Sequence, residues 1–245
     1  MIKVRGLTKS FGAQPVLRGI DLDMPDRSIT VIIGRSGGGK SVFLKHLLGL
    51  LRPDSGQVMI NGTDITNLGV RAMDEVRQHY GVVFQGGALF DSLTCFDNVA
   101  FPLREKTKLG HREIAERVEQ RLGQVGLAGV GPKYPAEISG GMRKRVAFAR
   151  ALVTDPEIVF FDEPTTGLDP VLVNTIHRLI LDLHRALGFT AVMVSHEIPE
   201  IFALADTVAM LHDGRIVAVG PPAAIQGSED PVVRQFIHGE PELSK

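Results

Sequence analysis

Short apolar runs alternate along this chain with longer segments in which apolar residues recur at helical spacing. Four of the runs are apolar enough to be buried on both faces of a sheet: Ile29 to Ile33, Gly81 to Phe84, Ile158 to Phe161 and Thr190 to Val194. Such runs are typical of strands in a mainly parallel sheet. Helical segments separate them, so the pattern predicts an α/β fold.

Two amphipathic helices can be predicted with their buried faces. The first has apolar residues at helical spacing and then a glycine that ends it: Ile176, Leu179, Ile180, Leu183, Leu187 and Gly188. The second lies in a helical region between about Gly86 and Pro156 and has one apolar face: Ile114, Val118, Leu122 and Val125. Asn61-Gly62 and Asp213-Gly214 are hairpin turn signals, so antiparallel ribbons should accompany the sheet.

Composition limits the class of protein without identifying it. The chain has 245 residues, 44% hydrophobic, and a formal net charge of -1, which gives no general reason to bind nucleic acid. The basic run at 143 to 145 is interpreted as a solvated helix face. Cys95 is the only cysteine, no secretion signal is evident at the start, and no uncharged run approaches the ~18 residues that cross a bilayer. We expect a cytosolic protein that reaches membranes only through partners.

A glycine-rich loop carries the strongest chemical signal. The strand ending at Ile33 is followed by GRSGGGKS, which matches G-x-x-x-x-G-K-[ST], and then by a helix-like segment. The loop's backbone N–H groups would wrap phosphate oxygens, Lys40 would reach the β- and γ-phosphates, and Ser41 would ligate Mg²⁺. Lys40 is expected to face solvent until nucleotide arrives. A tight turn without a ligand is the alternative, but the order strand, loop, helix favours a nucleotide.

Asp162 and Glu163 end the strand that begins at Ile158, where a parallel sheet delivers side chains to a ligand. Asp162 would help to hold Mg²⁺, and Glu163 would polarise the attacking water as general base. The alternative is that the two acidic residues are simply solvated at the end of the strand. The phosphate loop upstream favours the catalytic interpretation, because metal and water can neutralise two carboxylates beside a triphosphate.

Three further residues have candidate roles beside common structural ones. His196, after the strand TAVMVS, would contact the γ-phosphate or orient the water, although an isolated histidine there is more often a structural hydrogen-bonder. Gln85 would touch both Mg²⁺ and water, or merely cap its strand. Phe11 would stack on adenine, or belong to the core.

The stretch ISGGMRKR at 138 to 145 has a glycine turn leading into a helix-compatible segment, an arrangement suited to an anion. It lies far from the phosphate loop in the sequence. One chain therefore carries two half-sites.

The ordered set Phe11, GRSGGGKS, Gln85, ISGGM, FFDEP, TGLD and His196 resembles the ATP-binding cassette (ABC) ATPases over nearly the whole chain. The resemblance implies a P-loop NTPase (RecA-like) core with an N-terminal antiparallel β subdomain and an inserted α-helical subdomain. It implies binding of ATP and Mg²⁺ in a head-to-tail homodimer. There the Ser139-Gly140-Gly141 turn of one chain caps the γ-phosphate held by the other. Met142 stands where Gln is usual, which leaves ribose contacts open, and Val42 stands where Thr is commoner.

From these motifs we assign residues and boundaries. Catalytic residues are Glu163, His196, Gln85 and Lys40, and metal ligands are Ser41, Gln85 and Asp162. Nucleotide contacts come from Phe11, Gly34, Arg35, Ser36, Gly37, Gly38, Gly39, Lys40, Ser41, Val42, Ser139, Gly140 and Gly141. We expect a single domain, 1–245, in which 1–85 and 157–225 form the nucleotide-binding core. Residues 86–156 form the helical subdomain, and 226–245 are a C-terminal segment.

Three longer stretches, GRSGGGKSV, FQGGALFDSLTCFDNVAFPL and SGGMRKR, together resemble the MlaF-type ATPases of the maintenance-of-lipid-asymmetry transporters. This closer resemblance implies a peripheral subunit on the cytoplasmic face of the inner membrane, beneath an integral-membrane permease that moves phospholipid. It also implies an MCE-domain lipid-binding partner and a small STAS-domain protein. The apolar stretch from Gly86 to Leu103 follows Gln85 and would supply a groove for a cytoplasmic helix of the permease.

Other readings predict different features. A soluble ABC protein acting on nucleic acid or ribosomes would carry twin cassettes, a long coiled coil or a basic surface, and the sequence has none of these. A non-catalytic nucleotide-binding regulator would not need Glu163 and His196. An importer ATPase for another small substrate remains open, because the cassette never touches the cargo.

Overall fold

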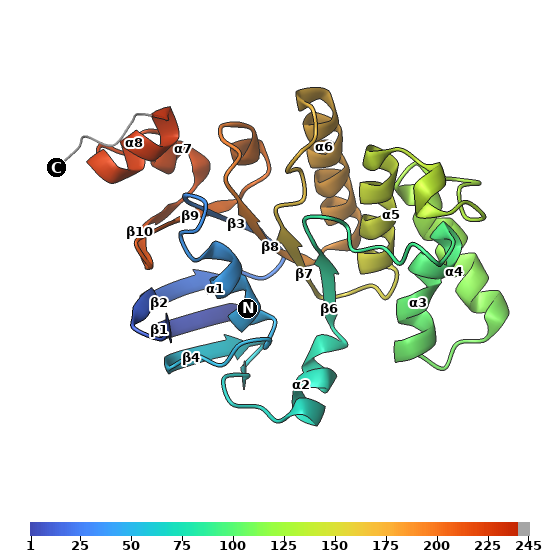
Figure 1. The fold of residues 1–245 in the computed structure, drawn as a ribbon, viewed down its shortest axis with the longest axis horizontal. Helices are drawn as coiled ribbons and strands as arrows, with labels where there is room; N and C mark the ends of the chain where they lie inside the picture. The colour runs from blue at the N-terminus through green and yellow to red at the C-terminus, as the bar shows by residue number, and fades with distance from the viewer. Residues whose placement is uncertain (240–245) are drawn as a thin grey trace. The chain divides into compact units, whose positions relative to one another are not determined.

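The computed structural model describes residues 1–239, and its fold divides into two compact units (Figure 1). Unit 1 comprises Met1–Glu75 and Thr190–Lys245, and unit 2 comprises Val76–Phe189. The boundaries predicted from the sequence, with a helical subdomain at 86–156, stay a prediction. Six residues of the predicted C-terminal segment, 240–245, lie outside the described residues.

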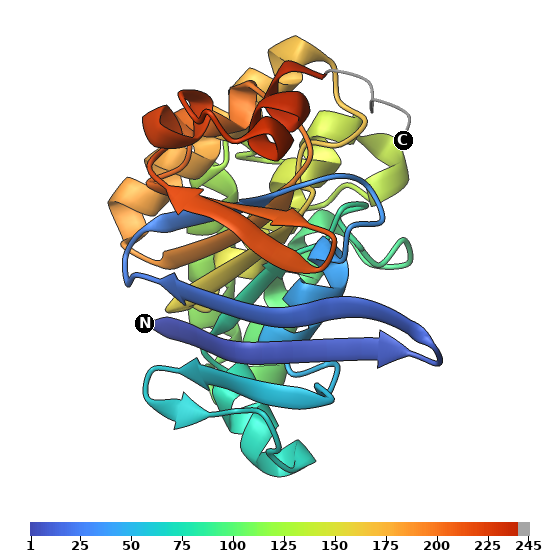
Figure 2. The ribbon, with the colours of Figure 1, turned by 90° about the vertical axis from the view of Figure 1, so that its left-hand side faces the viewer.

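Unit 1 begins with an antiparallel sheet in the order β2-β1-β4-β5. Its strands are β1 (Ile2–Phe11), β2 (Gln14–Met24), β4 (Ser55–Ile60) and β5 (Thr63–Asp64). The long β1–β2 hairpin lies in front in Figure 2. Asn61 and Gly62 join β4 to β5 with φ angles of 49° and 84°, as a two-residue hairpin turn requires, so that prediction is confirmed.

The second group of strands in unit 1 has the order β10-β9-β3-β8. These strands are β3 (Ile29–Ile33), β8 (Thr190–Ser195), β9 (Thr207–His212) and β10 (Arg215–Gly220). β3 is parallel to both β8 and β9, and every residue of β3 and β8 is buried, as their apolar runs predict. Ile33 pairs with Ser195, so the segments that follow β3 and β8 leave the sheet at the same edge.

Helices complete unit 1. They are α1 (Lys40–Leu47), the 3₁₀ helix η2 (Glu200–Ala203), α7 (Pro222–Gln226) and α8 (Pro231–His238), and α2 (Val70–Arg77) crosses into unit 2. None of the helices within residues 1–239 is long and apolar enough to cross a membrane.

Unit 2 contains two parallel strands, β6 (Tyr80–Val83) and β7 (Ile158–Asp162). Val83 pairs with Phe161, so the residues after β6 and the acidic pair at the end of β7 share one edge. The helices of this unit are α3 (Cys95–Lys106), α4 (His111–Gln124), η1 (Pro135–Glu137), α5 (Gly140–Leu152) and α6 (Pro170–Leu187). Helices α3, α4 and α5 pack against one another (Figure 1).

Local sequence explains where the helices of unit 2 begin and end. The Asp169 carboxylate accepts hydrogen bonds from two backbone N–H groups at the start of α6, and Pro170 occupies its first position. Gly188, with φ 69°, ends the helix as predicted. On α4 the predicted apolar face is buried, and each of its large side chains contributes roughly 1.5–3 kcal/mol by leaving water.

Candidate active site

The candidate residues fall into two groups, one in each unit. Unit 1 holds Phe11, the loop 34–42 and His196. Unit 2 holds Gln85, the 139–141 turn, Asp162 and Glu163.

The loop between β3 and α1 depends on glycine at particular positions. Gly34 has a φ of 153°, and a Cβ there would lie 2.2 Å from the backbone oxygen of Leu211. Gly39 has a φ of 96° and is the residue before α1, where no side chain caps the helix. A larger residue would clash at the first position and be strained at both. The sequence therefore keeps the backbone of this loop free of side chains, as a phosphate cradle requires.

Lys40 is buried, with 4% of its surface exposed, so the expectation that it faces solvent is wrong. Its Nζ donates hydrogen bonds of 2.8 Å to the backbone oxygens of Gly34 and Arg35. These carbonyl groups hold the ammonium group inside the curve of the loop. Sequence reasoning identified the residue but missed this arrangement, because a lysine in a loop is ordinarily exposed.

The start of α1 is suited to an anion. Ser41 is exposed in the first turn, and that turn carries no acidic residue. The unsatisfied N–H groups of a helix N-terminus favour negative charge. Ser36 and Gly37 of the loop are also exposed, whereas Arg35, Gly38 and Val42 are half-buried.

His196 follows β8 directly and is exposed at the edge from which the phosphate loop leaves β3. The register that pairs Ile33 with Ser195 therefore brings Gly34 and His196 together as neighbouring strand exits. Phe11, at the end of β1, is 49% exposed, with the Lys9 ammonium group 5.8 Å from the ring centroid. An exposed ring beside a cation is available for stacking, and the alternative that Phe11 belongs to the core is excluded.

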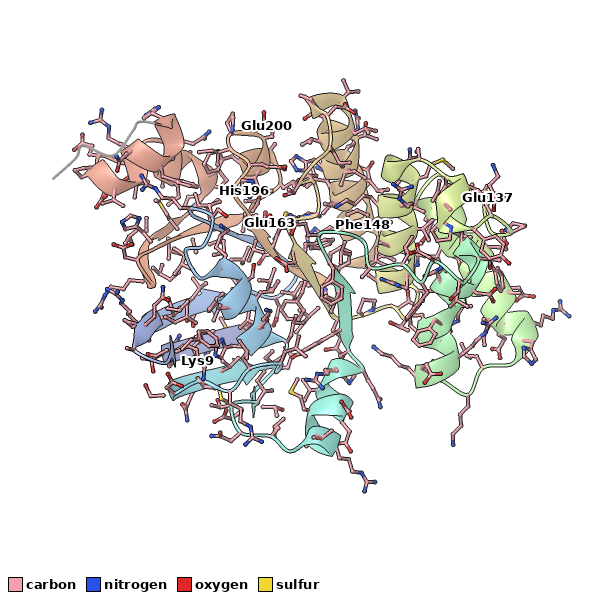
Figure 3. The ribbon with its side chains drawn as sticks, viewed as in Figure 1. Lys9, Glu137, Phe148, Glu163, His196 and Glu200 are labelled. Carbon is pink, nitrogen blue, oxygen red and sulfur yellow. The ribbon has the colours of Figure 1, made fainter. Side chains whose placement is uncertain are left out.

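Asp162 and Glu163 stand at the carboxyl end of β7, and both are half-buried. Glu163 is labelled in Figure 3. Glu163 has a φ of 48°, which is uncommon for a residue with a side chain. Its Oε2 accepts a hydrogen bond of 3.2 Å from the hydroxyl group of Thr166. The unusual backbone and this hydrogen bond fix the direction of the carboxylate, as a general base needs.

Gln85 lies two residues beyond β6 and its side chain is exposed. Its backbone oxygen accepts a hydrogen bond from the Nζ of Lys144, which is buried on α5 with 7% exposure. The interpretation of 143 to 145 as a solvated face is therefore wrong for Lys144. The helix turns this side chain inward, because Lys144, Ala147 and Phe148 share one face of α5.

The 138–145 stretch forms the turn into α5, as predicted. Ser139 is the N-cap, and its Oγ accepts a hydrogen bond of 3.3 Å from the Met142 N–H. Ser139 and Gly140 are exposed, whereas Gly141 is buried and a Cβ there would lie 3.3 Å from Leu172. Arg143 donates to the Ile138 oxygen over 3.0 Å and ties the helix to the turn.

Three residues in contact with candidate residues or their loops escaped sequence reasoning: Thr166, Lys144 and Arg150. Thr166 lies three residues after Glu163, a spacing that a turn could have suggested. The two basic residues donate hydrogen bonds to residues 59 to 63 positions away in the sequence, and no local pattern predicts such contacts.

Comparison with known proteins decides the family. Residues 17–166 match the ABC transporter family. The chain belongs to this family. It is an ATP-binding and ATP-hydrolysing cassette, so the enzyme class expected from the motifs is confirmed.

Among the relatives of this ABC chain is the ribonucleotide transport ATP-binding protein mkl of Mycobacterium leprae, 47% identical over 97% of this chain. The chain spans 69% of that relative and 66% of the Mycobacterium tuberculosis one. The intermembrane phospholipid transport system ATP-binding proteins MlaF of Haemophilus influenzae and Escherichia coli are 40% and 39% identical over 98% of this chain. The chain spans 91% and 89% of these two. The resemblance to MlaF-type ATPases is thus confirmed.

Solved structures confirm the predicted fold. The dimeric structure of MJ0796, a bacterial ABC transporter cassette bound to ADP and phosphate, matches with a TM-score of 0.82 at 30% identity. That match covers 91% of this chain and 99% of MJ0796. cbiO1 of Clostridium perfringens, part of an ABC transporter complex, gives a TM-score of 0.86 at 30% identity and covers 96% of this chain and 93% of its own.

Proposed function

We propose that this chain is the ATP-hydrolysing subunit of a transporter that moves phospholipid between the inner and outer membranes. The observation that carries the proposal is the alignment with MlaF proteins, which spans 98% of this chain and about nine-tenths of theirs. Similarity over such a length includes the phosphate loop, the 138–145 turn and the stretch between them.

The residue roles follow from their chemistry. Lys40 and the loop N–H groups bind the β- and γ-phosphates, and Glu163 removes a proton from the attacking water. His196, at the strand exit beside the loop, orients that water or the γ-phosphate, and Phe11 stacks on the adenine ring.

Mg²⁺ fits the donor set of Ser41, Gln85 and Asp162. A hydroxyl group, an amide oxygen and a carboxylate are hard oxygen ligands, and the exposed Ser41 begins a helix whose first turn carries no competing acid. When bound, the ion would neutralise the charge that develops on the phosphate oxygens.

The exposed Ser139-Gly140 turn supports a composite site in a head-to-tail homodimer. Ser139 and Gly140 are exposed at the start of α5, where the N–H groups of a helix N-terminus favour an anion, although the Met142 N–H already donates to the Ser139 Oγ. The dimeric state of the MJ0796 cassette is consistent with this arrangement. ATP closes the dimer, and hydrolysis reopens it.

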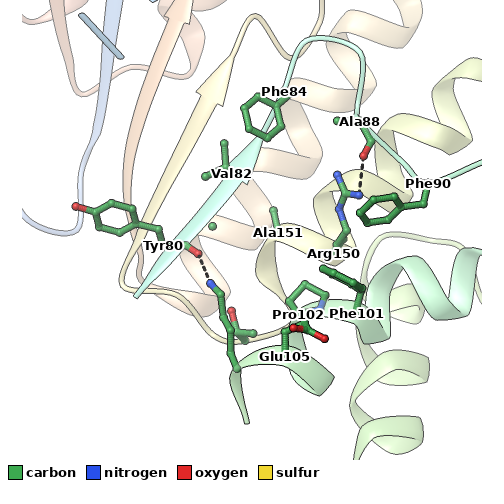
Figure 4. Close-up of a pocket in the computed structure, with 13 residues that line it drawn as sticks. Tyr80, Val82, Phe84, Ala88, Phe90, Phe101, Pro102, Glu105, Arg150 and Ala151 are labelled. Atoms are coloured by element: carbon green, nitrogen blue, oxygen red, sulfur yellow. Dashed lines mark hydrogen bonds between the residues drawn. The ribbon is translucent and has the colours of Figure 1, made fainter. Parts of the chain in front are cut away.

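A cavity of about 340 Å³ in unit 2 is the surface we assign to the permease (Figure 4). Phe90 and Phe101 line it, are 45% and 39% exposed, and lie with ring centroids 5.1 Å apart. Glu105, Lys106 and Arg150 add charges to its lining. Apolar rings bordered by charges suit an amphipathic cytoplasmic helix of a permease.

Phe101→Glu should abolish copurification of the chain with its permease while ATP binding persists. A carboxylate in the cavity would have to lose its hydration when the apolar face of an amphipathic helix docks. The measurement is pull-down of the membrane complex together with binding of labelled ATP. Val70→Glu is the matched control, because Val70 is 79% exposed on α2, outside the cavity. Loss of folding in the isolated Phe101→Glu chain would show that the residue belongs to the core instead.

The remaining partners and the location follow from the MlaF comparison. We propose that the complex includes an MCE-domain lipid-binding protein and a small STAS-domain protein. The chain would then be peripheral, on the cytoplasmic face of the inner membrane.

The cargo is tested by reconstituting the membrane complex in vesicles and following ATP-dependent transfer of fluorescent phospholipid to acceptor vesicles. Ribonucleotide is the second candidate, because the mycobacterial relatives that carry it in their name are 47% identical to this chain. Uptake of labelled ribonucleotide by the same vesicles, without phospholipid transfer, would reject the lipid proposal. The catalytic assignments would be unaffected.

A further inference from the structure

The loop that follows Gln85 is held by two cations of α5. Besides the bond from Lys144 to the Gln85 oxygen, Arg150 donates from Nη1 to the Ala88 oxygen over 2.7 Å (Figure 4). Its Nη2 donates to the Gly87 oxygen, also over 2.7 Å. Three of the four backbone carbonyl groups between Gln85 and Ala88 thus point to basic side chains of one helix.

The backbone of this loop requires such support. Gly87 has a φ of 76° and Ala88 a φ of 49°, so two successive residues are left-handed. An alanine in this conformation is strained and persists only where surrounding contacts determine it. The two left-handed residues direct their carbonyl groups to the same guanidinium group.

Arginine is chemically suited to this task. Its planar group presents fixed N–H donors to two acceptors at once, and hydrogen bonds from a charged donor are stronger than those between neutral groups. Burial lowers the pKa of Arg150, but an arginine remains charged. The Phe90 ring centroid, 5.9 Å from the guanidinium carbon, adds a cation–π contact.

We propose that Lys144 and Arg150 are positioning residues that hold the 85–88 loop so that the Gln85 side chain is presented at the edge where β7 delivers Asp162. α5 begins at the Ser139 turn, so the helix that carries the second anion-binding surface also holds the loop that carries Gln85. Arg150 in addition touches Phe90, which lines the cavity assigned to the permease. The inference rests on the proposed role of Gln85.

A double-mutant cycle on the full-length chain tests the proposal. Arg150→Met and Lys144→Met are each made alone and combined with Gln85→Ala. Each single change should lower kcat about 10- to 100-fold, the loss expected when a group in the site is misplaced by about 1 Å, with the Kd for MgATP unchanged. In the Gln85→Ala background, neither methionine should lower kcat further, because the group that the cations position is already absent.

Conservative variants separate positioning from general stability. Lys144→Gln keeps an N–H donor for the Gln85 oxygen and should restore most of the kcat lost in Lys144→Met. Arg150→Lys keeps the charge but offers one nitrogen to two carbonyl groups. It should therefore restore only part of the kcat lost in Arg150→Met. Arg112→Met, at a side chain 92% exposed on α4, is the control for loss of an arginine.

The outcomes distinguish the inference from the function on which it rests. If Gln85→Ala turns over ATP normally, the role of Gln85 fails and the inference fails with it. Suppose instead that Gln85→Ala is impaired while Arg150→Met and Lys144→Met lower kcat by the same factor with or without Gln85. That result, or methionine variants with wild-type kcat, overturns only the positioning inference. Should a methionine variant not fold, the same cycle with Arg150→Lys decides by the same criterion of additivity.

Discussion

Glu163→Gln should lower ATP turnover by roughly 10²–10⁴-fold, the usual contribution of a general base, while MgATP binding is retained. The amide keeps the size of the side chain and can still accept from the Thr166 hydroxyl group, which now donates to Oε2 over 3.2 Å. What it loses is the basic carboxylate that takes the proton from water. Single-turnover hydrolysis and equilibrium binding of labelled ATP, measured on the same preparation, separate the two effects.

The variant should also accumulate as a closed dimer in MgATP, because reopening depends on hydrolysis. Gel filtration with and without MgATP measures this directly. Glu157→Gln is the matched control, since Glu157 is exposed just before β7, at the end of the strand opposite to Glu163. A Glu163→Gln chain that stays monomeric and turns over ATP at the wild-type rate would mean that another group activates the water.

Strands and turns were predictable because their signals are local. β3, β6, β7 and β8 lie within a residue or two of the apolar runs that predicted them. Runs without polar residues are typical of strands buried on both faces, as β3 and β8 are, whereas in the Gly81 to Phe84 run Val82 is half-buried and Phe84 is exposed. Turns at Asn61 and Asp213 were likewise fixed by residues that tolerate positive φ.

The environments of the charged side chains were not predictable in the same way. Lys40 and Lys144 were both expected to be exposed, and both are buried with backbone oxygens as acceptors. The sequence does not indicate which loop carbonyl groups will accept these hydrogen bonds, because every residue has a carbonyl group. Positive φ at Ala88 and Glu163 could not be predicted either, because tertiary contacts rather than residue type stabilise it.

Whether the Ser139 turn acts on the nucleotide of a partner chain is a question of dimer geometry that two damaged chains can answer. One chain carries Lys40→Ala with an intact turn, and the other carries Ser139→Arg with an intact phosphate loop. Both carry Glu163→Gln, so that bound ATP is retained rather than hydrolysed. Either chain alone should trap little ATP, because both sites of its homodimer are damaged.

Mixing the two chains should restore ATP trapping at one site per dimer if the sites are composite. The intact loop of one chain then faces the intact Ser139 turn of the other, and both lesions fall together in the second site. If each turn instead closed over its own chain's nucleotide, every site would keep one lesion and mixing would change nothing. Retention of labelled ATP after rapid desalting measures trapping, and crosslinking shows that mixed dimers form.

Mixed dimers that trap no more ATP than their parents would contradict either the composite site or the assumption that one intact site holds the dimer shut. Two tandem-linked dimers separate these explanations, because their composition does not depend on mixing. A Lys40→Ala half linked to a Ser139→Arg half has an intact site only if the sites are composite, whereas an undamaged half linked to a half with both lesions has one only if each chain uses its own turn. Trapping in the second linked dimer alone would reject the composite site, and trapping in neither would show that one intact site does not hold the dimer shut. Lys40 makes the experiment demanding, since its Nζ also donates to the Gly34 and Arg35 oxygens and alanine could loosen the loop. Lys40→Met, which keeps the buried stem, repeats the test without that loss of packing.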